Sequence, residues 1–562
     1  MKLPDVLRAR LAVGVLACAL VCLSAGTVAG AGAAGELDPS FGTGGRIALG
    51  SFATKARLGA LAVDSRGRAV VADEPDGLAV RRFTVRGRVD RSFGRRGRVV
   101  LAGRKFAVAT AVAVDAGGRV VVAGGLGGRG ATGLVVARLN PDGSPDLSFG
   151  ARGVSVLRPP QADAEEVVLR VMATPDGVLV LGSRLTLARL TNAGSPDPRF
   201  GTGGYLRLPV PPVTPPSFND SEDTTLVGAF SVDLLARPEG RVLVLSQNVY
   251  AAIHGGHADP LLSLVSPTGV VLERVTPPAY TLNLVSALLP SPGTGFAAVG
   301  GFTDPYGGGP TFAVLGRYEV NGKPVPSFGG GHPVSITDAQ SDSFAATTGL
   351  LAEHRYTVAT MPGLLRFDER GHRDKSYGAC GVARIGSAFS LAAQGRSRVL
   401  ALTQANAPQN SLHAQTSLVA VRAHGASNPH TRPVFGRYDP YVGDASGIDN
   451  SSLRSVARRR PIVVHAETPQ RGSLTVMLVT KTKIPGLPRL LARAGAQTKP
   501  CHGVKVTLKA DRRVRRVIGS LRRKLNRAPN NPGSVDFRIR IVLHNGAGTR
   551  RFVIDESLSS FP

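Results

Sequence analysis

A short motif containing Asp, an aromatic residue and Gly recurs along this chain at intervals of about 50 residues. Its clearest copies are DPSFG at 38–42, DRSFG at 90–94, DLSFG at 146–150 and DPRFG at 197–201. Weaker copies occupy 324–329 and 373–378. A turn glycine precedes the aromatic residue by six positions in five copies, which composition alone would not produce. Repeats of this length predict a repeat array or a propeller.

Two kinds of residue define the repeat and are expected to be structural rather than catalytic. The aromatic positions are Phe41, Phe93, Phe149, Phe200, Phe328 and Tyr377. The turn glycines are Gly87, Gly143, Gly194, Gly269, Gly322, Gly371 and Gly425. An earlier turn in each period gives a second count, with one copy near His354 that has lost its glycine. Both counts predict seven units.

Each period has the pattern of four short strands. In the unit that contains Phe149, they are expected at 107–114, 119–123, 134–139 and 153–157. The runs of Val, Ala and Leu are nearly continuous, which indicates sheets buried on both faces. The turn at 140–143 reads Asn-Pro-Asp-Gly, in which Pro sets φ, Asp caps locally and Gly accepts a positive φ. Trp is absent, so the repeated Phe must supply much of the packing.

The two ends of the array complement each other. An extra motif at 38–42, with a strand expected at 45–49, precedes the first full unit, and no Phe-Gly pair begins six positions after Gly425. The N-terminal strand can therefore complete the last unit and leave no open sheet edge. The sequence predicts a mainly β fold: a seven-bladed β-propeller closed by its N-terminal strand, followed by a small β-rich domain with one helix.

The motif at 38–45, DPSFGTGG, and the segment 137–150, ARLNPDGSPDLSFG, resemble the bacterial delta-60 repeat family. The resemblance covers about 37–425 and is weakest in units four and seven. It implies a β-propeller on an exported bacterial protein. The family has no general enzymatic assignment, so the resemblance implies no catalytic residues.

The first residues have the order of a secretory signal peptide. Lys2, Arg8 and Arg10 precede an apolar stretch at 11–22 and a run of small residues to 34. We expect a signal peptide at 1–34 with cleavage near residues 29–34, and a secreted or envelope-associated protein. An uncleaved anchor is the alternative, because 11–34 carries no charge. Cleavage would leave Cys380 and Cys501, as one disulfide or as two separate thiols.

The expected domains are a propeller at 35–425, a linker at 426–461 and a basic domain at 462–562. Positive charge concentrates at the C-terminus, because 431–562 holds 26 Lys and Arg against 8 Asp and Glu, in a chain of net charge +29. Strands are expected at 462–465, 473–480, 504–508, 535–543 and 550–554, with a helix at 511–527. This pattern is similar to the small Ig-like basic modules of secreted actinobacterial proteins.

The helix at 511–527 allows two interpretations. It can lie on anionic lipid or polymer, or its apolar stripe can pack on the sheet with its Arg face solvated. The charge makes anionic envelope polymer or lipid a candidate partner. Specific nucleic-acid binding is not expected.

Candidate catalytic chemistry is sparse. The segment 254–259, HGGHAD, contains metal-ligand types but no second ligand cluster, so an ordinary polar loop is favoured. Glu165 and Glu166 are adjacent rather than facing, and the repeated Asp residues are expected to cap their own turns. The glycines at 124–128 lack the Lys-Ser/Thr of a phosphate loop. No catalytic, metal-binding or cofactor-binding residue is assigned, and no cofactor is predicted.

Two functions remain open from the sequence. The first is an exported non-enzymatic propeller that acts as a binding or scaffold protein, with an unknown ligand. The second is an extracellular hydrolase or lyase whose site lies in the axial funnel, because propellers can assemble sites from distant blades. The long connections at 208–221 and 301–310 are expected on a rim, where ligands commonly bind. Carboxylates or His at one axial mouth would favour the enzyme, and an uncharged funnel beside one broad apolar or basic patch would favour binding.

Overall fold

A computed structural model describes the chain in segments. They are residues 34–53, 61–72, 78–102, 107–126, 133–160, 166–211, 225–251, 257–277, 284–302, 312–336, 348–360, 363–378, 381–404, 413–424, 434–436, 462–467, 471–480, 488–499, 504–509, 512–517, 520, 535–545 and 548–558. Residues 1–33 of the expected signal peptide at 1–34 lie outside these residues, as do Gly425, Cys380 and Cys501.

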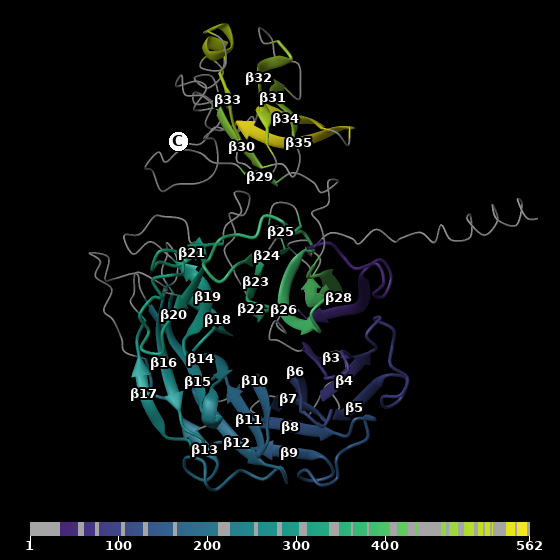
Figure 1. The fold of residues 1–562 in the computed structure, drawn as a ribbon, viewed down its shortest axis with the longest axis vertical. Coiled ribbons are helices and arrows are strands. Elements are labelled where there is room, and N and C mark those ends of the chain that lie inside the picture. The colour runs from purple at the N-terminus through teal and green to yellow at the C-terminus, as the bar shows by residue number, and fades with distance from the viewer. Residues whose placement is uncertain are drawn as a thin grey trace, which may run out of the picture.

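Seven four-stranded antiparallel sheets form a β-propeller around a common axis (Figure 1), which confirms the predicted fold. Blades 1 to 3 contain β2 (Leu61–Val63), β3 (Ala69–Ala72), β4 (Leu78–Phe83), β5 (Arg98–Ala102), β6 (Ala107–Val114), β7 (Val120–Leu126), β8 (Leu134–Leu139), β9 (Val154–Leu157), β10 (Val168–Thr174), β11 (Gly177–Gly182), β12 (Thr186–Thr191) and β13 (Tyr205–Arg207). Blades 4 and 5 contain β14 (Thr225–Ala236), β15 (Val242–Ala251), β16 (His257–Val265), β17 (Val271–Val275), β18 (Leu284–Pro290), β19 (Phe296–Phe302), β20 (Phe312–Tyr318) and β21 (Val334–Ser335). Blades 6 and 7 contain β22 (Thr348–Ala352), β23 (Arg355–Thr360), β24 (Gly363–Phe367), β25 (Val382–Ala383), β26 (Ser387–Gln394), β27 (Arg398–Gln404) and β28 (His413–Arg422).

The N-terminal strand closes the ring, as the sequence predicts. Strand β1 (Arg46–Ala53) pairs antiparallel with β28 and becomes the outer strand of blade 7, with Arg46 opposite Val419. The first strand of each blade contacts the first strand of the next, and β26 returns to β2. These seven strands form the inner wall of the propeller.

The hydrophobic core is divided into clusters that neighbouring blades share. Alternate residues of β7 belong to different clusters: Val120 and Val122 pack with blade 1, whereas Val121 and Ala123 pack with blade 3. A strand whose two faces are both buried needs apolar residues at every position. The uninterrupted Val and Ala runs follow from this arrangement.

The turn glycines meet two requirements, a positive φ and a close contact with the preceding blade. Gly143 adopts φ +87°, and a Cβ at that position would lie 2.6 Å from the amide nitrogen of Gly94 in blade 1. It would also lie 3.0 Å from the Phe93 ring. The glycine of one blade therefore packs against the aromatic residue of the blade before it. In the turn between β22 and β23, Glu353 and His354 adopt the positive φ that Gly provides in other blades.

The folded ring begins no later than Ala34. This residue lies at the end of the range 1–34 that the sequence assigns to the signal peptide. It is buried with Tyr377 between blades 6 and 7, and its carbonyl accepts a hydrogen bond from the Gly378 amide. These contacts place Ala34 in the interface between blades 6 and 7.

The C-terminal region forms two sheets. The first has the order β29 (Val434–Gly436), β30 (Ile462–Glu467) and β33 (Val504–Leu508). The second has the order β32 (Leu490–Thr498), β31 (Gly472–Thr480), β34 (Val535–Asn545) and β35 (Gly548–Leu558). Strand β32 lies where the sequence predicted no strand, and β29 lies inside the expected linker at 426–461. The segment 490–498, LLARAGAQT, has small residues and little apolar alternation beyond Leu491, so it gives a weak strand signal.

A helix is described at 512–517, within the range 511–527 predicted to be helical. Val514 is buried, and Arg512, Arg513 and Arg516 are exposed. This arrangement agrees with an apolar stripe packed on the protein and a solvated Arg face. In the described part of the chain, no helix is long and apolar enough to span a membrane.

Candidate functional site

Each Asp of the repeat caps the turn that follows it. The Asp146 Oδ1 atom accepts hydrogen bonds from the Ser148 amide at 3.1 Å and from the Ser148 hydroxyl at 2.6 Å. The Asp90 carboxylate accepts the same pair from Ser92. Amides two positions later also donate to Asp38, Asp197 and Asp374. The carboxylates therefore have the local structural role that the sequence predicts.

An arginine eight positions before this Asp binds its other oxygen. Arg138 Nε lies 2.7 Å from Asp146 Oδ2, and Arg82 Nε lies 2.8 Å from Asp90 Oδ2. Both arginine side chains are almost completely buried, with exposed fractions of 3% and 1%. In each contact the Arg and the Asp belong to the same blade and lie at its interface with the next blade. We call these contacts the interblade pairs, which are Arg82–Asp90, Arg138–Asp146, Arg189–Asp197 and Arg366–Asp374.

Each interblade pair extends to the next blade. Arg82 donates to the Pro141 carbonyl, Arg138 to the Asn192 carbonyl and Arg366 to the Ala423 carbonyl. Each acceptor lies two positions before a turn glycine. The same guanidinium groups lie over the rings of the repeat aromatics. The Arg138 Cζ atom is 4.6 Å from the centroid of the Phe149 ring. One arginine thus joins a charge pair, a neighbouring turn and an aromatic ring.

These contacts shift the ionisation of the carboxyl groups. Burial acts to raise the pKa of Asp146, but hydrogen bonds from Ser148 and Arg138 outweigh it and hold that pKa below its ordinary value. The pKa of Asp90 is lowered in the same way by Ser92 and Arg82. The ionised form of these aspartates is therefore favoured in the folded protein.

Blades 4, 5 and 7 depart from the pattern. Blade 7 has Ala420 at the arginine position, and Arg398 from β27 binds Asp38 Oδ2 instead. This pair joins the N-terminal segment to the end of the ring. Blade 5 keeps Arg317 without the Asp, and blade 4 has Leu264 in place of the arginine.

The repeat residues that the sequence singles out lie at the blade interfaces. All six aromatic residues are at most 1% exposed, and each packs with the following blade. The glycines at 87, 143, 194, 269, 322 and 371 all have positive φ. The arginines were missed by sequence reasoning, although a search at eight positions before each Asp would have found them.

The inner wall has few charges. Its described strands contain mainly Ala, Val, Leu, Ser and Thr, and their charged residues are Arg170 and Asp233. Arg170 Nε lies 2.8 Å from Asp233 Oδ1, while Asp233 Oδ2 accepts the Leu288 amide of blade 5. These two residues therefore join blades 3, 4 and 5 along the inner wall.

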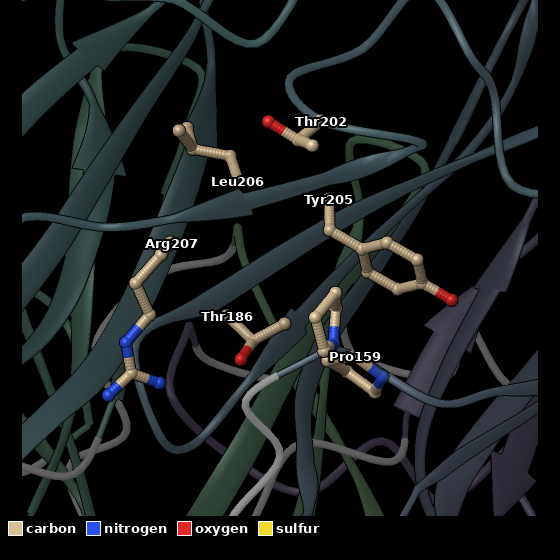
Figure 2. Close-up of a pocket in the computed structure, with 7 residues that line it drawn as sticks. Pro159, Thr186, Thr202, Tyr205, Leu206 and Arg207 are labelled. Atoms are coloured by element: carbon tan, nitrogen blue, oxygen red, sulfur yellow. The ribbon is translucent and has the colours of Figure 1, made fainter.

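A cavity of about 240 Å³ lies at the outer edge of blade 3. Its lining includes Thr186 and Arg207 together with Pro159, from the connection after blade 2. Figure 2 shows the Tyr205 ring beside Pro159, with Thr186 between Pro159 and Arg207. The Arg207 guanidinium also donates to the Arg184 carbonyl. This site is small and lies away from the inner wall.

The remaining sequence candidates do not form a site among the described residues. Three candidate segments lie partly outside the described residues: 254–259, 208–221 and 301–310. Glu165 and the end of the glycine run at 124–128 lie outside them. Glu166 is buried, and its carboxylate accepts the Arg184 amide. Within the described segments, no group of three or more His, Cys, Asp or Glu residues is arranged to hold a metal ion.

The four-stranded C-terminal sheet has one buried face and one open face. Leu474, Val476 and Leu478 of β31 are buried, whereas Thr475 and Met477 between them are only half buried. Met477 pairs with Arg493 on one side and with Arg540 on the other. Arg551 pairs with Val542, which lies two positions from Arg540, so Arg551 shares this open face.

We call the open side with exposed Arg493, Arg540 and Arg551 the basic sheet face. Ser473, Gln497 and His544 lie on the same face, as their pairing shows. The face presents positive charge and polar groups to solvent. An arrangement of this kind can bind an anionic partner through guanidinium groups.

Comparisons with known proteins agree with the propeller fold. A family model described as "Domain of unknown function (DUF5122) beta-propeller" matches residues 118–149. No curated protein matches the chain.

Solved structures that resemble the chain include the WD40 β-propeller domain of Doa1, at 10% identity and a TM-score of 0.33, over 63% of this chain and 90% of that one. An aldose sugar dehydrogenase from Streptomyces coelicolor has 11% identity and a TM-score of 0.29, over 66% and 96%. An α-L-arabinofuranosidase from Fusarium graminearum has 10% identity and a TM-score of 0.33, over 56% and 92%.

Proposed function

We propose that this chain is an exported, non-enzymatic propeller of the delta-60 repeat type that acts as a binding or scaffold protein. It works at the cell envelope or outside the cell. The ring presents its rim loops to a ligand, while the basic C-terminal domain holds the protein on anionic envelope polymer or lipid. The observation that carries the proposal is the basic sheet face, where three arginines are exposed on one side of a sheet.

The composition of the inner wall supports the same proposal. A hydrolase or lyase whose site lies in the axial funnel would need acidic or basic groups that converge near the axis. Here the charged residues of the described inner strands, Arg170 and Asp233, bind each other and the neighbouring backbone. They act as a structural link between blades, and the wall around them is apolar or weakly polar.

The experiment is a retention assay of the full-length protein on isolated envelope polymer over a range of salt concentrations. We expect retention at low salt that falls steeply as salt rises, because exposed ion pairs are screened. Absence of retention at low salt would overturn the envelope part of the proposal. Release of shortened polymer products during the incubation would overturn the non-enzymatic part and favour a hydrolase or lyase.

A further inference from the structure

We propose that the basic sheet face is the docking surface for a linear, flexible polymer with a phosphate group in each repeat unit. This inference rests on the proposed function and adds to it the surface and the chemical class of the partner. Its three arginines come from three different strands, β32, β34 and β35.

The spacing of these arginines suits a ligand that carries several anionic groups. Arg493 and Arg540 flank β31, so their backbones are separated by two strand spacings, about 10 Å. Arg551 is a diagonal neighbour of Arg540, at about 7–8 Å. One phosphate ion could contact all three guanidinium groups only if the three side chains bent toward the same point and brought their positive charges together. An extended chain can place successive phosphates on successive arginines.

The residue type favours phosphate as the recognised group. The planar guanidinium donates two parallel hydrogen bonds to phosphate oxygens and stays charged at every physiological pH. In the propeller, the buried arginines of the interblade pairs are engaged by carboxylates and carbonyls. The side chains of the basic sheet face are exposed instead, so their donors face solvent.

The surroundings of the arginines favour a polymer in solution over a lipid bilayer. Surfaces that insert into a bilayer combine basic residues with large exposed apolar side chains. The described neighbours on this face are the polar residues Ser473, Thr475 and Gln497, the half-buried Met477 and Val542, and the exposed Leu490 at the start of β32. A single exposed leucine at the edge offers little surface to insert among acyl chains.

The experiment measures binding of labelled long-chain inorganic polyphosphate to the full-length protein by fluorescence anisotropy. The test variant carries Arg493→Gln, Arg540→Gln and Arg551→Gln. The control carries Arg86→Gln, Arg91→Gln and Arg95→Gln, which removes the same charge from exposed positions on blade 1. Both variants are first compared with the natural protein by thermal unfolding to verify the fold.

We expect the test variant to bind polyphosphate about 10- to 100-fold more weakly at low salt, and the control to stay within about twofold. The slope of log affinity against log salt should fall by about 2 in the test variant, because each lost phosphate contact removes about 0.7. Orthophosphate at the same phosphate concentration should not compete.

Three results would overturn the inference. The first is an equal loss of polyphosphate affinity in the test and control variants. The second is full competition by orthophosphate. The third is that the same face binds anionic vesicles or duplex DNA more tightly than polyphosphate. Retention on envelope polymer that persists in the test variant would contradict this surface while leaving the proposed function intact. Polyphosphate binding by a protein that is not retained on envelope polymer would support this surface and would overturn the envelope part of the proposed function.

Discussion

The propeller and the C-terminal domain use arginine in different ways. In the propeller, Arg138 is almost completely buried and contacts Asp146, the Asn192 carbonyl and the Phe149 ring. In the C-terminal sheet, Arg493 and Arg540 are exposed beside a half-buried methionine. The first kind of arginine joins two blades, and the second presents charge to solvent.

This difference shows why net charge alone is a poor guide to partners. Most interblade arginines are balanced by an aspartate eight positions later, so they add little free charge to the ring. The region 431–562 has few acidic residues to balance its 26 Lys and Arg. Substitutions in the ring should therefore affect stability, and those on the basic sheet face should affect binding.

The largest effect on stability is expected for Phe149→Ala. The Phe149 side chain is fully buried between blades 2 and 3, and its loss leaves a cavity at that interface. We expect a loss of about 3–5 kcal/mol in the free energy of unfolding, measured by chemical denaturation. A loss below about 1 kcal/mol would contradict the packing role of the repeat aromatics.

A smaller loss, about 3 kcal/mol, is expected for Arg138→Met. Methionine keeps much of the apolar contact with Phe149 but removes the cation nearest to the buried Asp146, which leaves only Arg119 at 3.8 Å. The matched variant Arg138→Met/Asp146→Asn should regain part of this stability, because an amide carries no charge. If the double variant is no more stable than the single one, the charge pair is not the cause.

The stability of the propeller should depend on pH through the carboxyl groups of the interblade pairs. The pKa values of Asp90 and Asp146 in the folded protein lie below the unfolded value of about 3.9. Their contribution is therefore present above about pH 4 and is lost as the pH falls through the folded values. Unfolding midpoints at pH 6 and pH 3 should differ less for the Arg138→Met/Asp146→Asn variant than for the natural protein.

The smallest effect on stability is expected on the basic sheet face. Each of Arg493→Gln, Arg540→Gln and Arg551→Gln should change the free energy of unfolding by less than about 0.5 kcal/mol, because these side chains are exposed. Thermal unfolding of the three single variants measures this. A loss above about 2 kcal/mol in any of them would place that arginine in the structural class of Arg138.

Much of the ring could be predicted from the sequence because its signals are local. The turn glycines and the Asp-x-x-Phe spacing reflect turn geometry within one unit, and the extra motif at 38–42 indicates the closure by β1. The pairing of Arg398 with Asp38 could not be predicted, because these residues are distant in sequence and Ala420 breaks the usual spacing.

The open face of the C-terminal sheet was harder to predict. Sequence reasoning located the charge and most strands but missed β32, in which Arg493 is flanked by Ala and Gly residues. The strand order β32-β31-β34-β35 brings Arg493 and Arg540 to the same face across β31. Strand order and register depend on tertiary contacts, so one chain's pattern of residues does not determine them.

The most direct test of the account compares the two triple Arg→Gln variants with the natural protein for retention on isolated envelope polymer over a salt series. The account predicts that the variant at 493, 540 and 551 elutes at much lower salt, while the variant at 86, 91 and 95 elutes with the natural protein. Equal elution of all three proteins would contradict the role of the basic sheet face, and retention that does not depend on salt would place recognition in the loops of the propeller.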